Sequence, residues 1–280
     1  MAVALIDADS IYFRIACVTK KQKDIRSGIN HTMKEIEKEV MMATFEDVTM
    51  MVAVKGRGNF RKDLYPEYKA QRKELEEDMK AALNYGHQYM VDKWGAVQAD
   101  GMEADDLVSI WAYEARAAEQ QYVICGIDKD LLQIPGNHYN FGKKTNDFID
   151  DDTANLNLML QCLTGDSTDN IPGIKGIGPK KAATILNGVP MARRWDRVRA
   201  AWRAKSAGNV NVSYDLLRML TSWEDFDDIK AKITGETPVS ERNVLSREEK
   251  QDSEVSELSE RDQGPDDGDE LAFWRTHGGL

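Results

Sequence analysis

Cysteine and long apolar runs are both scarce in this chain of 280 residues. The three cysteines, Cys17, Cys125 and Cys162, stand alone with no C-x-x-C pair, which argues against a disulfide framework and a zinc site of that spacing. Hydrophobic residues make up 41% of the chain, but no run approaches the roughly 18 residues that a membrane-spanning helix needs. The opening residues, MAVALIDADSIYF, lack the basic segment of a secretory signal. We therefore expect a cytoplasmic protein with no membrane partner.

Positive charge is also in deficit, because the chain carries a formal net charge of −11. The charge is unevenly distributed, and residues 241–280 alone hold 12 acidic and 5 basic residues. By contrast, residues 55–73 hold seven bases against two acids, and residues 175–203 hold eight bases against one acid. Attraction of a polyanion depends on the local field and not on the total charge. The two basic segments therefore indicate either contacts with nucleic acid or two solvated helix faces.

Apolar runs typical of strands alternate with helical patterns in the first half of the chain. We expect strands at residues 3–6, 49–54, 121–127 and 138–141. This alternation predicts an α/β domain with a central, mostly parallel sheet flanked by helices. After about residue 155 the pattern is helical only, which predicts a second, smaller helical region.

Composition divides the chain into three parts. The α/β pattern covers residues 1–155 and the helical region covers residues 156–237. Residues 238–280 are rich in Ser, Glu and Asp without apolar periodicity, so we expect an acidic, disordered tail. Its last apolar cluster, ELAFWRTHGGL, is either a docking peptide for a partner or a frayed terminus.

Carboxylates stand at the predicted strand ends and helix starts. They are Asp7, Glu103, Asp105, Asp106, Asp128, Asp130, Asp166 and Asp169. Because the carboxyl ends of parallel strands share one edge of a sheet, we expect these side chains to converge. Carboxylates so close together need a counter-charge, which divalent cations such as Mg²⁺ supply. Two ions about 4 Å apart in such a site support in-line displacement at a phosphodiester. Taken singly, each acidic motif can also be a helix cap or a turn.

The segment GIKGIGPKKAATIL combines glycines with lysines at the start of a predicted helix. Gly173, Gly176 and Gly178 permit backbone conformations that other residues avoid, and Pro179 suits the first turn of a helix. Backbone N–H groups at that turn, with the neighbouring lysines, are expected to bind phosphate without reading base sequence. The lysines are Lys175, Lys180 and Lys181. The segment resembles a helix-hairpin-helix motif.

Five motifs appear in the order found in flap endonucleases and 5'-to-3' exonucleases. They are LIDAD, YPEYKAQR, EADD, IDKDLLQI and TGDSTDNIPGIKGIGPKKA. Over about residues 1–235 the chain resembles bacteriophage exonucleases and the nuclease domain of bacterial DNA polymerase I. The resemblance implies a PIN-like domain with a short helical arch at about residues 58–95, followed by a helix-hairpin-helix DNA-binding region. It also implies two-metal hydrolysis of DNA in replication or repair.

The resemblance further implies cofactors and partners. These are two Mg²⁺ or Mn²⁺ ions, K⁺ at the helix-hairpin-helix, and DNA with 5' ends, nicks, gaps or flaps, with RNA in hybrids as a further substrate. We expect a monomer, in the host cytoplasm if the protein is phage-encoded, whose acidic tail is a candidate contact for a replication partner.

Carried over by position, the resemblance assigns the acids to two ions. Asp7, Glu103 and Asp105 are assigned to the first ion, with Asp106 nearby. Asp128, Asp130, Asp166 and Asp169 are assigned to the second. Lys69 and Arg72 are expected at the base of the arch, where cations contact the scissile phosphate. Tyr68 is either a platform for a terminal base or a core residue.

One acid of the family pattern is missing. Aligned on the FRK that follows, Val54 stands where the family has an aspartate at the end of the second strand. Either Asp9 of the DAD pattern compensates, or the first ion binds through water, or the first site is weak and turnover slow. The predicted arch is also short, which favours duplex ends, gaps or nicks over the threading of a long flap.

Three hypotheses about function remain open. The first is an active, structure-directed 5' nuclease. The second is a binder of branched DNA that lost cleavage with the acid at position 54. The third is a phosphatase of the haloacid dehalogenase type, because DADS mimics its D-x-D motif, although that class has no use for a helix-hairpin-helix.

Overall fold

The computed structural model describes residues 1–205 and 208–240. Residues Met1–Phe226 form one compact unit, and a second unit begins at Asp227, inside helix α10 (Trp223–Thr234). Most of the predicted tail lies outside the described residues. Within the described ranges, no helix combines the length and the apolar character needed to cross a bilayer.

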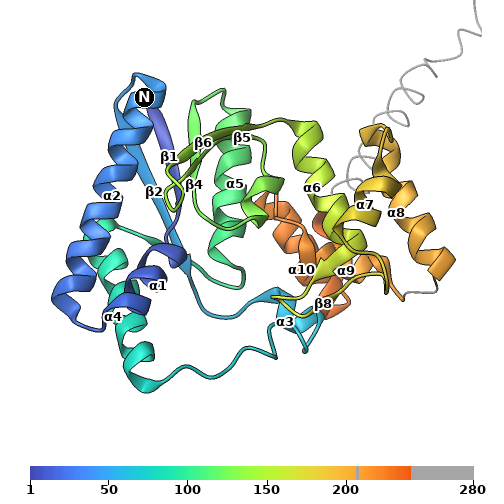
Figure 1. Cartoon of the computed structure of the whole chain (residues 1–280), viewed down its shortest axis with the longest axis horizontal. Coiled ribbons are helices and arrows are strands. Elements are labelled where there is room, and N and C mark those ends of the chain that lie inside the picture. Colours follow the sequence, from blue (N-terminus) through green and yellow to red (C-terminus); the bar gives the residue numbers. More distant parts are fainter. Residues whose placement is uncertain (206–207, 241–280) are drawn as a thin grey trace, which may run out of the picture. The chain divides into compact units, whose positions relative to one another are not determined.

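A six-stranded sheet forms the centre of the first unit, in the order β3-β2-β1-β4-β5-β6 (Figure 1). The strands are β1 (Ala2–Asp7), β2 (Val48–Lys55), β3 (Val97–Ala99), β4 (Tyr122–Cys125), β5 (Gly136–Asn140) and β6 (Thr145–Ile149). Every pair is parallel except the β5–β6 hairpin. The predicted mostly parallel sheet is therefore confirmed.

Helices cover both faces of this sheet (Figure 1). Helices α1 (Asp9–Val18), α2 (Gln22–Thr44) and α4 (Glu77–Trp94) pack on one face, and α5 (Ala104–Ala117) packs on the other. Helix α2 packs on the sheet through one apolar face, because its buried residues recur every three or four positions. They are Ile25, Ile29, Met33, Ile36 and Val40. Each isoleucine removed from water contributes about 1.5–3 kcal/mol.

The segment expected to form an arch contains helix α3 (Phe60–Leu64), a connection at residues 65–76, and α4. Helix α4 buries Ala82, Leu83 and Met90 in the main core. It therefore lies against the sheet domain, and only residues 65–76 run without a helix between α3 and α4 (Figure 1).

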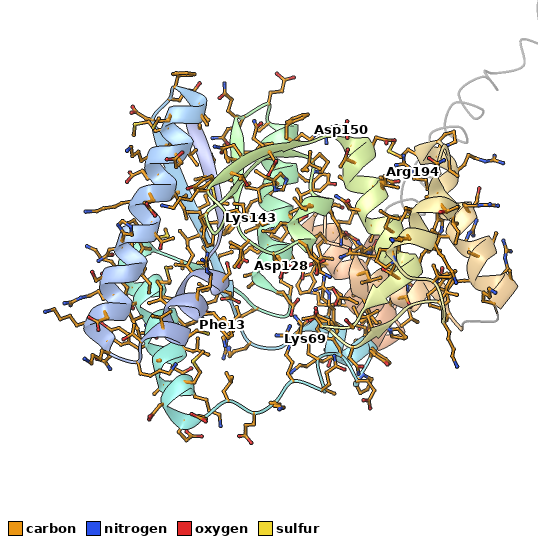
Figure 2. All side chains as sticks on the ribbon, viewed as in Figure 1. Phe13, Lys69, Asp128, Lys143, Asp150 and Arg194 are labelled. Atoms are coloured by element: carbon orange, nitrogen blue, oxygen red, sulfur yellow. The ribbon has the colours of Figure 1, made fainter. Side chains whose placement is uncertain are left out.

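The helical region holds a second core. Its helices are α6 (Asp151–Thr164), α7 (Pro179–Leu186), α8 (Met191–Lys205) and α9 (Val210–Leu217). Trp202 of α8 is buried, and its indole N–H donates to the carbonyl of Cys162 in α6 (2.9 Å). Arg194 of α8 is also buried and pairs with Asp152 (2.7 Å), so this base of the second basic segment holds α8 on α6 (Figure 2). The predicted domain boundary at residue 155 falls inside α6.

Candidate active site

Strand ends and helix starts position the acids as the topology requires. Asp7 ends β1, and Asp128 follows β4, the parallel neighbour of β1. Asp130 begins a short 3-10 helix, η1 (Asp130–Gln133), and its N–H donates to Asp128 Oδ1 (3.0 Å). Glu103 caps α5 and Asp105 lies in its first turn.

A tight hairpin brings the last two acids to the same place. It consists of β7 (Gly165–Asp166) and β8 (Ile171–Pro172), with Asp169 in the turn between them. Gly173 follows directly, and a Cβ there would stand 2.2 Å from the carbonyl oxygen of Thr164. Only glycine allows this close approach, so Gly173 is required by the packing of the hairpin against α6.

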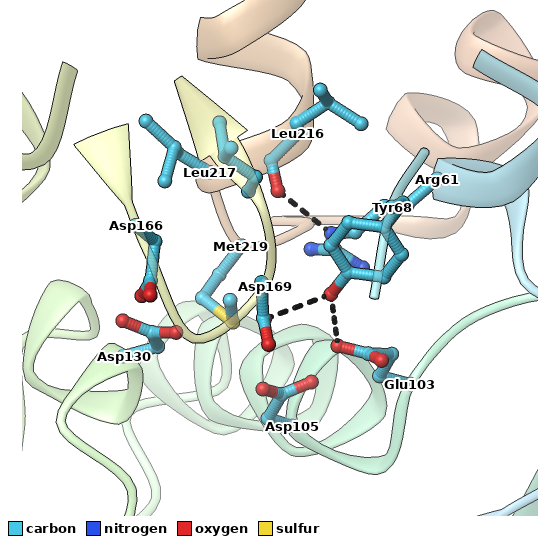
Figure 3. A pocket seen from close by; sticks show the side chains of 11 residues that line it. Arg61, Tyr68, Glu103, Asp105, Asp130, Asp166, Asp169, Leu216, Leu217 and Met219 are labelled. Carbon is cyan, nitrogen blue, oxygen red and sulfur yellow. Dashed lines mark hydrogen bonds between the residues drawn. The ribbon is translucent and has the colours of Figure 1, made fainter. Parts of the chain in front are cut away.

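One pocket collects five of the eight predicted carboxylates (Figure 3). They are Glu103, Asp105, Asp130, Asp166 and Asp169. In the close view, Asp130 and Asp166 lie side by side, and Glu103, Asp105 and Asp169 form a second group. These residues come from α5, η1 and the β7–β8 hairpin, so the predicted convergence of separate sequence motifs is seen in the fold.

Asp7 and Asp128 lie near this pocket without lining it. Burial raises the pKa of Asp7 to about 8, and the charges of Asp9, Asp128 and Glu103 add to the shift. Burial likewise raises the pKa of Asp130 to about 6, with Asp128 as the next cause. The pKa of Asp105 is also raised, by burial and then by Glu103. In each case burial is the largest cause, and the charge of a neighbouring carboxylate is the next.

Side-chain cations hold the other acids. Lys69 Nζ contacts Glu103 Oε1 and lies 3.4 Å from Asp169 Oδ2. Arg72 Nη2 lies 2.8 Å from Asp169 Oδ1, and Lys129 Nζ lies 2.6 Å from Asp166 Oδ2. Burial raises the pKa of Glu103, but Arg61 and Lys69 outweigh it and hold that pKa below its usual value.

These contacts also limit what the acids can bind as they stand. Among the residues that the structure describes, no three His, Cys, Asp or Glu side chains are arranged around a common ion position. Several carboxylate oxygens face Lys69, Arg72 or Lys129 instead. An ion can enter only if carboxylates exchange these partners for it.

Asp106 is a correction to the predicted set of ligands. Its two oxygens accept from the Arg61 guanidinium at 2.5 and 2.8 Å, and both side chains are almost fully buried. Asp106 Oδ2 also accepts the backbone N–H of Glu103 (3.1 Å), which completes the capping box of α5. With both oxygens committed, Asp106 orients the helix that carries Glu103 and Asp105. Sequence reasoning missed Arg61, and the only available signal was that a buried acid needs a cationic partner.

For Tyr68 the sequence left two roles open, a platform for a terminal base and a core residue. Only 2% of Tyr68 is exposed, so its ring cannot stack on a base in this structure, and the core alternative holds. Its hydroxyl lies 2.9 Å from Glu103 Oε2 and 3.1 Å from Asp169 Oδ2 (Figure 3). The tyrosine therefore connects Glu103 at the start of α5 with Asp169 of the β7–β8 hairpin, two members of the second group.

The predicted phosphate-binding segment lies at the start of α7. Gly178 is the N-cap residue, without a side-chain cap, and Pro179 is the first residue of the helix. Gly176 has a φ of +81°, in the left-handed region that favours glycine. Lys180 is exposed, and a hollow beside it is lined by three other lysines. These are Lys175, Lys181 and Lys205.

Residues 2–156, more than half of the chain, match the family model described as the 5'-3' exonuclease, N-terminal resolvase-like domain. The chain belongs to this 5'-3' exonuclease family. The phosphatase hypothesis therefore has no support. The fold also matches that of the 5'-exonuclease of bacteriophage T5 in a structure with bound zinc ions, with a TM-score of 0.61 and 19% identity. That alignment covers 84% of this chain and 99% of the T5 chain.

Curated relatives match parts of this exonuclease-family chain. DNA polymerase I of Rhizobium leguminosarum is 36% identical over 137 residues, which are 45% of this chain and 14% of the polymerase. The flap endonuclease Xni of Shewanella sp. strain MR-4 is 32% identical over 148 residues, which are 46% of this chain and 53% of the endonuclease. The matched part thus spans about half the length of that endonuclease and a small fraction of the polymerase.

Proposed function

We propose that this chain is a metal-dependent 5' nuclease that hydrolyses DNA phosphodiester bonds at 5' ends, nicks, gaps or flaps. The observation that carries the proposal is the pocket in which five carboxylates from separate elements meet, with Lys69 against two of them. A site so rich in oxygen donors and negative charge suits a hard divalent cation and disfavours an anionic ligand on its own. A divalent cation offsets the negative charge of the pocket and allows a phosphate to bind beside the carboxylates.

The donor set fits two divalent ions. Asp7, Glu103 and Asp105 would hold the first ion. The residues for the second are Asp128, Asp130, Asp166 and Asp169. Mg²⁺ and Mn²⁺ both take such oxygen ligands, and when bound they supply a nucleophile at neutral pH and stabilise the leaving oxygen.

Lys69 and Arg72 have a second role in this proposal. Both contact Asp169 in the protein alone, and Lys69 also contacts Glu103. With divalent ions held by these carboxylates, the Lys69 ammonium and the Arg72 guanidinium would be free to contact the phosphate. A positive group held there stabilises the charge that develops on the phosphate oxygens during cleavage.

The basic face of the helical region is the proposed contact for duplex DNA. The N-terminus of α7 offers free backbone N–H groups beside Lys180, and α8 adds exposed bases. The exposed bases of α8 are Arg193, Arg197, Arg199, Arg203 and Lys205. Contacts of this kind bind the sugar-phosphate backbone without base specificity, as expected for an enzyme that recognises the structure of its substrate.

The test is cleavage of 5'-labelled blunt, nicked, gapped and flapped DNA in Mg²⁺ and in EDTA. We expect short products in Mg²⁺ only, and their lengths report whether the enzyme removes nucleotides or cuts flaps. Asp130→Asn should abolish cleavage and spare DNA binding, while the matched control Asp147→Asn, on exposed β6, should cleave normally. Persistent cleavage by Asp130→Asn would contradict the site.

A second candidate function is binding of branched DNA without cleavage. It is favoured by Val54, which is apolar and fully buried where the family pattern has an acid. In that case the labelled DNA stays intact in Mg²⁺ as in EDTA, while a gel-shift experiment still detects the complex with branched DNA.

A further inference from the structure

The side chain at position 54 faces away from Asp7, so an acid at this position would not point at the first ion. In the parallel register of β1 and β2, Asp7 lies opposite Ala53, so these two side chains share a face of the sheet. Side chains alternate along a strand, and Val54 therefore points to the other face. There it is 0% exposed and packs in the core that α1, α2 and α4 build on the sheet. An aspartate at position 54 would be buried among apolar side chains, away from Asp7.

Asp9 reaches the end of β2 from the other direction. It is the first residue of α1, and its side chain is half-buried. Its Oδ1 accepts the backbone N–H of Lys55 (3.0 Å), the residue next to Val54. The hydroxyl of Tyr12 donates to the same oxygen (2.5 Å).

Asp9 also lies next to Asp7. The backbone N–H of Asp9 donates to Asp7 Oδ1 (3.2 Å), so the two acids lie at the shared edge of β1 and β2. Both donors to the Asp9 side chain use Oδ1. Within the part of the chain that the structure describes, Oδ2 accepts no hydrogen bond, and it is the oxygen left for another partner.

We propose that Asp9 supplies a carboxylate to the first ion from the start of α1, with Oδ2 as the ligand and Tyr12 as the group that positions it. The inference rests on the proposed metal-dependent function. It differs from the family pattern, because the acid comes from the start of α1 and not from the end of β2. An apolar residue at position 54 would then be compatible with a complete first site.

The variant Asp9→Asn tests this with a minimal change of shape. The amide oxygen of asparagine still accepts from Tyr12 and Lys55, while the charge and the free carboxylate oxygen are lost. The control is Asp150→Asn, because Asp150 also accepts a backbone N–H, from Thr153 (2.7 Å), at the opposite end of α6 from Asp166. Melting temperatures without metal show whether each variant is folded.

The readout is the affinity of the protein for Mn²⁺ in the absence of DNA. It is measured by calorimetry and by the electron paramagnetic resonance spectrum of free Mn²⁺. We expect Asp9→Asn to weaken the first ion at least about tenfold, with the second ion unchanged, and Asp150→Asn to match the wild type. Tyr12→Phe should give a smaller loss, because it removes only the positioning bond. Unchanged affinity in a folded Asp9→Asn protein overturns the assignment of Asp9 and leaves the proposed nuclease intact.

Two further outcomes distinguish a failure of the role of Asp9 from a failure of the proposed metal-dependent function. If the wild type binds no Mn²⁺, the metal-dependent function fails and the role of Asp9 fails with it. In Asp9→Asn/Val54→Asp, we expect a lower melting temperature and no recovery of Mn²⁺ affinity. Recovered affinity would show that an acid at position 54 does reach the ion, which contradicts the placement argued here.

Discussion

Lys69 bridges Glu103 and Asp169, one acid from the start of α5 and one from the β7–β8 turn. Its side chain is only 17% exposed, so the ammonium lies in the pocket and is not a mobile surface charge. Lys69 thus offsets the negative charge of these two carboxylates in the protein alone. This arrangement connects the sequence motif YKAQR to the carboxylates that lie far from it along the chain.

Lys69→Ala should lower cleavage far more than DNA binding. The positive charge is expected to act mainly on the transition state, where removal of one such group typically costs about 10²–10³ in rate. Single-turnover cleavage measures the rate, and a filter or gel assay in Ca²⁺ measures affinity. Lys73→Ala, an exposed lysine of the same segment, is the matched control. Equal losses in rate and affinity would reduce Lys69 to an ordinary phosphate contact.

The stability of the metal-free protein should fall as the pH rises from about 4 to about 8. The pKa of Asp7 is raised to about 8 in the folded protein and that of Asp130 to about 6, so the folded state binds more protons than the unfolded state over this range. Asp7→Asn should flatten this dependence and raise the melting temperature at pH 8. A thermal melt at pH 5 and pH 8 in EDTA checks it. A wild type that is more stable at pH 8 than at pH 5 would contradict the shifts.

Arg61→Ala should destabilise the fold strongly. It leaves Asp106 charged, buried and without its partner, which typically costs about 3–5 kcal/mol of unfolding free energy. The double variant Arg61→Met/Asp106→Leu should recover part of this loss, because it removes both charges but leaves the carbonyl of Leu216 and the N–H of Glu103 without these partners. Urea denaturation measures the difference. A loss from Arg61→Ala below about 1 kcal/mol would show that the pair contributes little.

Lys180→Glu should weaken duplex binding and reduce its dependence on salt concentration. Each phosphate contact that is lost lowers the slope of log affinity against log salt by roughly one. The control is Lys143→Glu, in the β5–β6 turn of the sheet domain (Figure 2). Fluorescence anisotropy at several salt concentrations gives the slopes. The same slope in Lys180→Glu and wild type would place the DNA elsewhere.

Much of the fold and the meeting of the acids could be predicted because both follow from local rules. Apolar strands that end in acids, such as the one ending at Asp7, dictate a parallel sheet with its acids at one edge. Other features depend on partners that sequence spacing does not reveal. The pairing of Arg61 with Asp106 joins residues 45 positions apart, and it turns a predicted ligand into a structural group. Tyr68 has a sequence context that suits a surface aromatic, and only tertiary packing buries it.

The same limit applies to Val54. The sequence motif places Val54 at the end of the second strand. The face of the sheet to which its side chain points depends on the register of β2 against β1. A shift of one residue would reverse that face. The packing of α4 in the core could not be predicted either, because the amphipathic pattern of a helix does not indicate which surface the helix covers.

The most direct test of the central claim is an anomalous difference map from crystals of the wild-type protein soaked in Mn²⁺. We predict peaks at the pocket of Glu103, Asp105 and Asp130, with carboxylate oxygens at about 2.0–2.3 Å and with Lys69 and Lys129 displaced. A map without peaks at these carboxylates, from crystals soaked at saturating Mn²⁺, would contradict the proposal that the acids are gathered to hold catalytic ions.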